Sequence, residues 1–495
     1  MRLGLGNALG RQMVINPDGL SLDLAFAADK TLTARKGPTP TFTRASTATY
    51  YGQLIDVSEG NIGTLTALTT TTVTAGRASW FKSSGGVDVT VYYDGSRWVV
   101  DIVELGGGSN HQAALGSEFR PEQANWSGSG ASVTTSSTFG IVRSAINEPR
   151  FDHNPVTLAC KGLLIEEERT NLTIQSQAFD DAAYSKAAIG VAAATITANN
   201  DTAPDGTLTA DLVNFSATTA IDQQGQLFRN VLVATAGQNV TLSIYMRVPS
   251  GTATVFIGLT ELSPLTGQSV ACNVTTTWQR FSITRTVLAT TSMFLQIGPV
   301  TSAFMGQPAV QPAASVLLWG AQLEAGAFPT SYIPTTTAAL TRSADVCSVT
   351  TAGWSNAGND TMLAEYFVST ATSGVVIVEG SPVVSWMSLS FSTSNRQRNI
   401  YRHGGTSTRF DATTDNNSVS LININKTALT SGEQLALNGS LSQTVASEIP
   451  QADISTSLSI GSRVSGATLF LNGHIARIKY FRKRLPNAKL QTLTT

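Results

Sequence analysis

Charged residues are scarce in this chain. Asp, Glu, Lys and Arg make up only 13% of its 495 residues, and the formal net charge is −1 at pH 7. A protein that binds nucleic acid usually presents a strongly basic surface to the phosphates. The composition therefore predicts no nucleic-acid partner, and the short basic cluster at 477–484 is expected to be the solvated end of a strand.

Cysteine and histidine are also rare. Cys160, Cys272 and Cys347 lie far apart and have no metal-ligand or paired spacing, so neither a zinc site nor a disulfide framework is expected. Four histidines leave little material for base catalysis or a metal centre. We therefore expect the cysteines to be small buried apolar residues.

Long apolar runs are missing as well. No window of roughly 18 apolar residues is present that could cross a bilayer. The first six residues lack the apolar core of a secretory signal. The sequence thus predicts no membrane insertion, and assembly in a reducing cytosol.

Strand patterns dominate what is present. β-Branched and aromatic residues alternate with polar ones at 87–93 and 239–246, and turn signals follow at short spacing. This period of two is typical of half-buried strands. The predicted fold class is therefore all-β. Because 495 residues exceed one ordinary core, we expect a multidomain chain of β-sandwich and jelly-roll modules. A short helix is expected over 486–493.

Charged strings interrupt this polar and apolar background. They read FTRAS at 42–46, NEPRFD at 147–152 and GLLIEEERTNL at 162–172. These strings resemble the N-terminal signature of bacteriophage fibre and minor tail proteins. In that family a short linker separates them, whereas here a long segment intervenes. The resemblance implies an N-terminal anchoring region, residues 1–59 with 138–172, interrupted by a small inserted β-module at 60–137.

The rest of the chain resembles two further modules. Residues 173–345 are similar to a carbohydrate-binding-module-like jelly roll, through the string LWGAQLEAG at 318–326. Residues 346–495 resemble a laminin-G or concanavalin A-like sandwich, through FLNGHIARIKYF at 470–481.

The family resemblance implies a virion structural protein that binds other virion proteins and host cell-surface polysaccharide. Its place would be the virion, assembled in the host cytoplasm, either as a fibre or minor tail protein or as a capsid-surface fibre or decoration protein. Such fibres are commonly trimeric, although no heptad stretch demands it. Attachment to the particle would use the charged residues of the anchoring region: Arg44, Arg150, Glu166, Glu168 and Arg169.

The alternative to an adhesin is a capsular polysaccharide depolymerase. Glycosidases need two carboxyl groups about 5–10 Å apart across a cleft, and the acidic run Glu166-Glu167-Glu168 is expected instead to pair with Arg150 or Arg169. Strand alternation would place Glu166 and Glu168 on one face. The chain is therefore not expected to be an enzyme.

No cofactor is expected from the sequence. Asp180 and Asp181 could ligate a structural calcium ion, because that ion prefers oxygen ligands. They complete no calcium-binding loop, so solvated turn positions are the favoured interpretation.

Aromatic residues are the remaining candidates for a site, because sugar rings stack on aromatic faces. Trp80, Trp98 and Trp126 belong to the inserted module and are expected to fill its core. In the C-terminal sandwich, Trp354, Trp386 and Tyr401 are predicted to form an exposed glycan-binding platform.

Overall fold

A computed structural model describes most of the chain. The described residues are 19–59, 63–74, 77–84, 87–93, 98–104, 109–114, 126–129, 133–302, 305–355, 360–368, 374–381, 385–391, 397–403, 406–411, 425–430, 435–441, 457–462 and 469–495.

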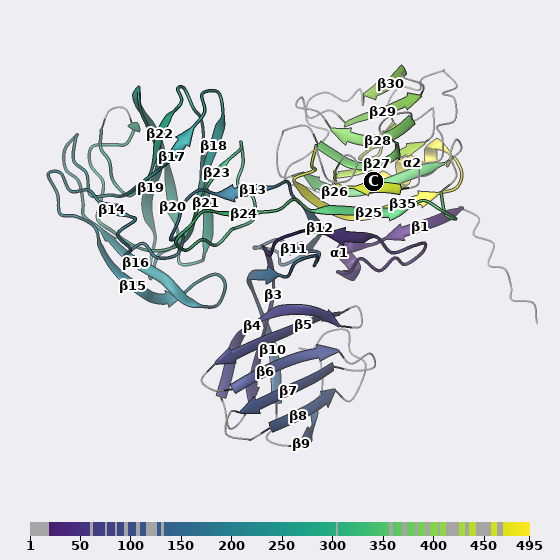
Figure 1. The fold of residues 1–495 in the computed structure, drawn as a ribbon, viewed down its shortest axis with the longest axis horizontal. Helices are drawn as coiled ribbons and strands as arrows, with labels where there is room; N and C mark the ends of the chain where they lie inside the picture. The colour runs from purple at the N-terminus through teal and green to yellow at the C-terminus, as the bar shows by residue number, and fades with distance from the viewer. Residues whose placement is uncertain are drawn as a thin grey trace, which may run out of the picture. The chain divides into compact units, whose positions relative to one another are not determined.

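Antiparallel β-sheets build the fold (Figure 1), which confirms the all-β class predicted from the alternation. The chain divides into two compact units. Unit 1 comprises Met1–Thr41, Cys347–Leu471 and Ile475–Thr495, and unit 2 comprises Phe42–Val346 with Asn472–His474. Residues 19–41 thus group with the C-terminal sandwich, which the sequence did not indicate.

The jelly roll of unit 2 has two five-stranded sheets on either side of one apolar core. Leu242, Ile244 and Val316 from one sheet and Leu259 and Leu295 from the other belong to this core, and each is fully buried. The first sheet has the order β15 (Thr195–Thr202), β16 (Leu208–Phe215), β23 (Ala314–Ala325), β18 (Asn239–Arg247) and β21 (Gln279–Thr286). The second has the order β14 (Ser185–Lys186), β17 (Leu227–Ala234), β22 (Thr291–Ile297), β19 (Ala253–Leu262) and β20 (Leu265–Val274).

Two long strands lead from the signature region into the segment that the sequence identifies as an insertion. β3 (Ala48–Glu59) and β10 (Val133–Ser144) pair antiparallel along their whole length. Between them runs a meander whose consecutive strands pair with each other: β4 (Gly63–Thr74), β5 (Arg77–Ser84), β6 (Val87–Tyr93), β7 (Trp98–Glu104), β8 (Ser109–Ala114) and β9 (Trp126–Ser129). The chain therefore enters and leaves this segment through neighbouring strands.

Short strands complete unit 2 around the signature strings. They are β2 (Thr41–Thr43), which begins in unit 1, β11 (Phe151–His153), β12 (Cys160–Ile165), β13 (Arg169–Asn171) and β24 (Leu340–Arg342). β11 pairs with β12 and β13 pairs with β24, both antiparallel.

Unit 1 is a sandwich in which the first strand of the described residues pairs with their last strand. β1 (Leu20–Leu24) lies antiparallel to β35 (Gly473–Phe481), with Leu22 opposite Tyr480. From β35 the sheet continues, in order of pairing, through β26 (Thr361–Val368), β31 (Asn425–Thr430), β32 (Leu435–Leu437) and β33 (Ser440–Leu441). The other sheet has the order β25 (Val346–Thr350), β34 (Ser457–Ile460), β27 (Gly374–Ser381), β28 (Ser385–Phe391), β29 (Gln397–His403) and β30 (Thr406–Asp411).

The described part of unit 1 contains the helices α1 (Phe26–Asp29) and α2 (Asn487–Thr494). α2 confirms the helix predicted over 486–493 and begins directly after Pro486, which has no backbone N–H to leave unpaired. Leu490 on this helix is fully buried in a cluster with Leu363, Phe481 and Leu485. The helix is thereby packed against the end of the sandwich.

Candidate functional site

Side chains of different signature strings meet in a buried cluster in unit 2. Arg150 is fully buried, and its Nη1 donates to Glu166 Oε2 at 2.8 Å and to the Thr49 carbonyl oxygen at 2.9 Å. Arg150 Nη2 donates to Asp345 Oδ2, and Asp345 Oδ1 accepts from Arg44 Nη1 at 3.1 Å. Asp345 therefore bridges two arginines that come from separate strings. We call these residues, with Arg342 and Ser331, the ion-pair cluster.

Glu166 is the second carboxylate of the ion-pair cluster. Ser331 donates its backbone N–H to Oε1 at 2.8 Å and its hydroxyl to Oε2, and Arg342 Nη2 lies 3.6 Å from Oε2. Burial raises the pKa of Glu166, but Arg342 and Arg150 outweigh it and hold the pKa at about 2. The carboxylate is thus ionised at neutral pH.

The ion-pair cluster decides what the predicted anchoring residues can do. Arg44, Arg150 and Glu166 are 1%, 0% and 6% exposed, so they present no charged surface to a partner. Arg150 pairs with Glu166, and Asp345 pairs with both Arg150 and Arg44. Their place is explained by the cost of burying charge, which is tolerable only when each group is paired and hydrogen-bonded. These residues hold the signature region together.

The other charged residues of this string, Glu167, Glu168 and Arg169, lie outside the ion-pair cluster. Arg169 is partly exposed and pairs with Glu167, while Glu168 is exposed. The prediction that Glu166 and Glu168 share a strand face was wrong, because β12 ends at Ile165 and strand alternation stops there.

Arg342 and Asp345 are members of the cluster that sequence reasoning did not select. A signal existed, since TRSAD at 341–345 echoes FTRAS at 42–46. In the structure the two strings touch: the Ser343 backbone N–H donates to Ser46 Oγ at 2.8 Å.

Asp152 is the centre of a second group of charged side chains in unit 2. Asp152 accepts from Lys161 Nζ at 2.6 Å and from His474 Nε2 at 2.7 Å, and its other oxygen accepts from the Tyr51 N–H at 2.7 Å. Burial raises the pKa of Asp152, but Lys161 and His474 outweigh it and lower that pKa. Burial, followed by Lys161, lowers the pKa of His474. Both partners of this His–Asp pair are buried.

We expect the ionised Glu166 of the ion-pair cluster to make unit 2 sensitive to acid. A carboxyl whose pKa is lower in the folded than in the unfolded chain stabilises the fold above the unfolded pKa, and this contribution is lost as the pH falls through the folded pKa. For Glu166 that window runs from 4.5 down to about 2. The melting temperature of the full chain should therefore fall steadily across this window, and one that stays constant would contradict an ionised buried carboxylate.

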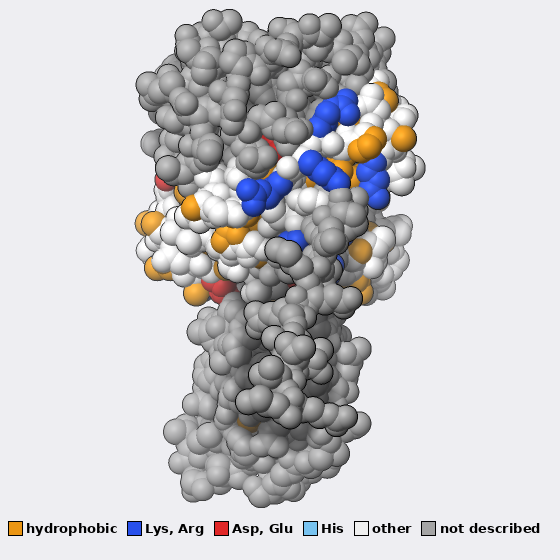
Figure 2. Space-filling view, turned by 90° about the vertical axis from the view of Figure 1, so that its right-hand side faces the viewer, with side chains coloured by type: hydrophobic (Ala, Val, Ile, Leu, Met, Phe, Trp, Pro, Cys, Tyr) orange, Lys and Arg blue, Asp and Glu red, His pale blue; other side chains and the backbone are white. Residues whose placement is uncertain are grey.

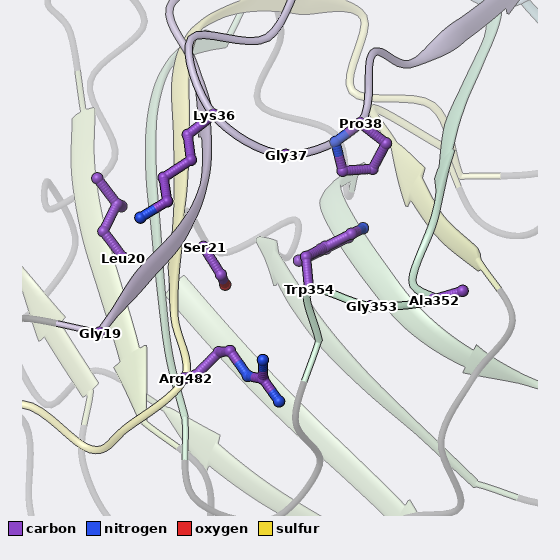
Figure 3. A pocket seen from close by; sticks show the side chains of 10 residues that line it. All are labelled: Gly19, Leu20, Ser21, Lys36, Gly37, Pro38, Ala352, Gly353, Trp354 and Arg482. Carbon is purple, nitrogen blue, oxygen red and sulfur yellow. The ribbon is translucent and has the colours of Figure 1, made fainter. Parts of the chain in front are cut away.

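An open pocket in unit 1 is the candidate binding site. Its volume is about 590 Å³, and it lies among β1, the loop 36–38, residues 352–354 and Arg482 (Figure 3). Lys36 and Arg482 flank Ser21 at one end, and Pro38 and Trp354 form the other end. None of the described residues that line the pocket carries a carboxylate side chain.

Backbone pairing positions the two cations of this pocket. The Asp23 N–H donates to the Lys36 carbonyl oxygen at 3.1 Å, which lays the loop against β1. The Arg482 N–H donates to the Gly19 carbonyl oxygen at 2.9 Å. Gly37 closes the loop with a φ of +82°, and a Cβ there would come within 2.8 Å of the Leu22 side chain, so only glycine fits.

The charges beside the pocket differ in whether they are neutralised. Arg477 forms a two-point pair with Asp23, at 3.0 and 2.8 Å, and Arg35 pairs with Asp29. Among the described residues, Lys36 and Arg482 make no ion pair, and both are exposed. Figure 2 shows Lys and Arg side chains gathered on one face, with few Asp or Glu among the described side chains there.

The aromatic platform predicted from the sequence is not present at Trp354. Its ring is 4% exposed, packs edge-on against Tyr480 at 5.0 Å, and donates its indole N–H to the Thr350 carbonyl oxygen. Trp354 is therefore a core residue whose edge forms part of the pocket wall, and the expectation of an exposed face was wrong.

The other predicted aromatic residues can be placed only by their backbone. Trp386 lies in β28 and Tyr401 in β29, and neither side chain is among the described ones, so the platform there stays a prediction. The same holds for the tryptophans of the insertion: Trp80, Trp98 and Trp126.

Several sequence expectations concern metals, thiols and membranes. Asp181 accepts from the Ala183 N–H at 2.8 Å, as a turn residue does, and Asp180 is exposed. Within the described ranges no group of three or more His, Cys, Asp and Glu residues could hold a metal ion.

Cys272 and Cys347 are buried, Cys160 is half-buried, and all three are free thiols. No helix in the described part has the length and apolarity to span a membrane.

Comparison with known proteins gives structural neighbours alone. No family model and no curated protein matches the sequence. The CBM40 module of Ruminococcus gnavus IT-sialidase, solved with α2,3-sialyllactose, is 16% identical with a TM-score of 0.25, over 28% of this chain and 84% of that chain. The tandem CBM22 of Paenibacillus barcinonensis Xyn10C is 11% identical with a TM-score of 0.22, over 66% and 92%. Bacteriophage CBA120 tailspike protein 4 is 10% identical with a TM-score of 0.24, over 32% and 21%.

Proposed function

We propose that this chain is a structural protein of a bacteriophage particle, a fibre or minor tail protein, that binds host cell-surface polysaccharide. The sequence support is the resemblance of three charged strings to the anchoring signature of such proteins. The structural support is the pocket of unit 1, which lies open on a β-sandwich and carries two cations without ion-pair partners among the described residues. Assembly would take place in the host cytoplasm, as a homotrimer by family resemblance.

The buried ion-pair cluster refines the anchoring part of this proposal. Because Arg44, Arg150 and Glu166 are buried and paired within the ion-pair cluster, attachment to the particle would depend on them through the fold of unit 2. Glu168 and Arg169 are at least partly exposed and are the members of the predicted set that could touch another virion protein. Labelling the protein on intact particles and imaging them tests virion attachment, and label on the head would favour a capsid-surface protein.

Binding without hydrolysis is the proposed activity. Glu166 of the acidic run is engaged by Arg150, Arg342 and Ser331, so it is committed to the fold. Incubating purified full-length protein with host capsule and measuring released reducing ends tests this, since release above background would identify a depolymerase.

We expect adhesion to depend on the number of copies displayed. An open, shallow site gives weak single-site binding, and several copies on one particle multiply it through effective concentration. The soluble full chain should therefore bind host cells at least about 100-fold more weakly than particles that display it. Flow cytometry with labelled protein, free or coupled to beads, measures this difference, and equal apparent affinities would contradict it.

A further inference from the structure

We infer that the pocket of unit 1 binds a sugar residue that bears a carboxylate. The inference rests on the proposed function and specifies its ligand. It begins from the contrast among the basic side chains around the pocket. Arg477 and Arg35 are neutralised by Asp23 and Asp29, whereas Lys36 and Arg482, which line the pocket, have no carboxylate partner in the described part of the chain.

This contrast matters because the chain is poor in charge overall. Charged residues make up 13% of the sequence, and one acidic residue of β1, Asp23, is already held in two hydrogen bonds by Arg477. Two cations that share one opening, with no acidic side chain among the described lining residues, produce a local positive potential. An anionic group is the ligand that such a potential favours.

The chemistry of the two cations favours a carboxylate in particular. The planar guanidinium of Arg482 can donate two parallel hydrogen bonds to a carboxylate, while the Lys36 ammonium acts as a point charge. Backbone pairing with Asp23 and Gly19 fixes where both side chains start. Their long side chains remain exposed, so they can adjust to the ligand without disturbing the core.

The rest of the lining suits a sugar ring. Pro38 and the edge of Trp354 supply an apolar wall for C–H surfaces, and the Ser21 hydroxyl lies between the two cations (Figure 3). Gly37 and Gly353 keep side chains out of the opening. The volume of about 590 Å³ lies within the range of about 300–1,000 Å³ usual for small-ligand sites.

The test uses the full-length protein and three immobilised acidic polysaccharides: polygalacturonate, hyaluronate and polysialic acid. Each is compared with its carboxyl-reduced form, which keeps the sugar and removes the charge. We expect binding to at least one acidic polymer and about tenfold or greater loss on its reduced form. Dextran sulfate is included, and preferential binding to it would overturn the carboxylate assignment in favour of a sulfate.

The double variant Lys36→Ala/Arg482→Ala should lose the same binding by about tenfold or more, with an unchanged melting temperature, because both side chains are exposed. Lys489→Ala is the matched control, since it removes an exposed charge from α2 outside the pocket and should bind normally. Unchanged binding by the double variant, equal binding to acidic and reduced polymers, or no binding to any acidic polymer would overturn the inference. Adsorption of whole particles to host cells is scored separately, so that host adhesion can survive when the pocket assignment fails.

Discussion

Replacing Glu166 by Gln should lower the free energy of unfolding by about 3–5 kcal/mol, because removing one partner of a buried ion pair leaves the other charge uncompensated. Glu166 lies 2.8 Å from Arg150 Nη1 and 3.6 Å from Arg342 Nη2, and both arginines are almost completely buried. An amide keeps the shape but cancels the negative charge. Chemical denaturation would measure the loss of stability. Hydrogen exchange of β11 and β12 would show where in the structure the loss occurs.

Glu168→Gln is the matched control for this substitution. It makes the same chemical change two residues away on an exposed side chain, where the expected effect is within about 0.5 kcal/mol. If the two variants unfold alike, the cluster does not stabilise unit 2. If Glu168→Gln lowers the copy number in purified particles without lowering stability, the exposed carboxylate takes part in virion assembly.

Replacing Trp354 by Ala should destabilise unit 1 by about 3–5 kcal/mol, as truncation of a buried aromatic residue does. The ring is 4% exposed, and the substitution removes its packing against Tyr480 and its hydrogen bond to the Thr350 carbonyl oxygen. Thermal melting of the full-length variant, with hydrogen exchange of β35 as the local probe, measures the effect.

Arg482→Ala separates this effect from ligand binding. It changes another residue of the same pocket but removes an exposed side chain, so the melting temperature should stay within about 1–2 °C of the original. An unaltered melt for Trp354→Ala would show that the indole does not support the core, and would restore the exposed platform as an interpretation.

The behaviour of the acidic run shows how far local patterns reach. Alternation of apolar and polar residues correctly predicts strands, because side chains of a strand point to opposite faces whatever the strand packs against. The same rule fails for Glu166 and Glu168, because it applies only while the strand continues and β12 ends at Ile165. The end of a strand depends on its partner, which lies elsewhere in the sequence.

Tryptophan illustrates the same limit for the candidate site. Local context cannot tell whether an indole is core or surface, since both positions favour aromatic residues among polar loops. Trp354 is buried because Tyr480 and Thr350, distant from each other along the chain, both meet it. The sequence does not indicate Lys36 and Arg482 as a site, because they are far apart along the chain. The pairing of β1 with β35 brings them to one pocket.

The sequence by itself determined the all-β class, the short C-terminal helix and the scarcity of charge, because periodicity, proline position and composition act locally or as simple sums. The tertiary structure alone decided that β1 joins the C-terminal sandwich and that Asp345 bridges Arg44 and Arg150. It also decided that Lys36 and Arg482, which have no ion-pair partner in the described ranges, share an open pocket. These outcomes depend on long-range antiparallel pairing and on the cost of burying a charge without a partner, and both are properties of residues that meet only when the chain is folded.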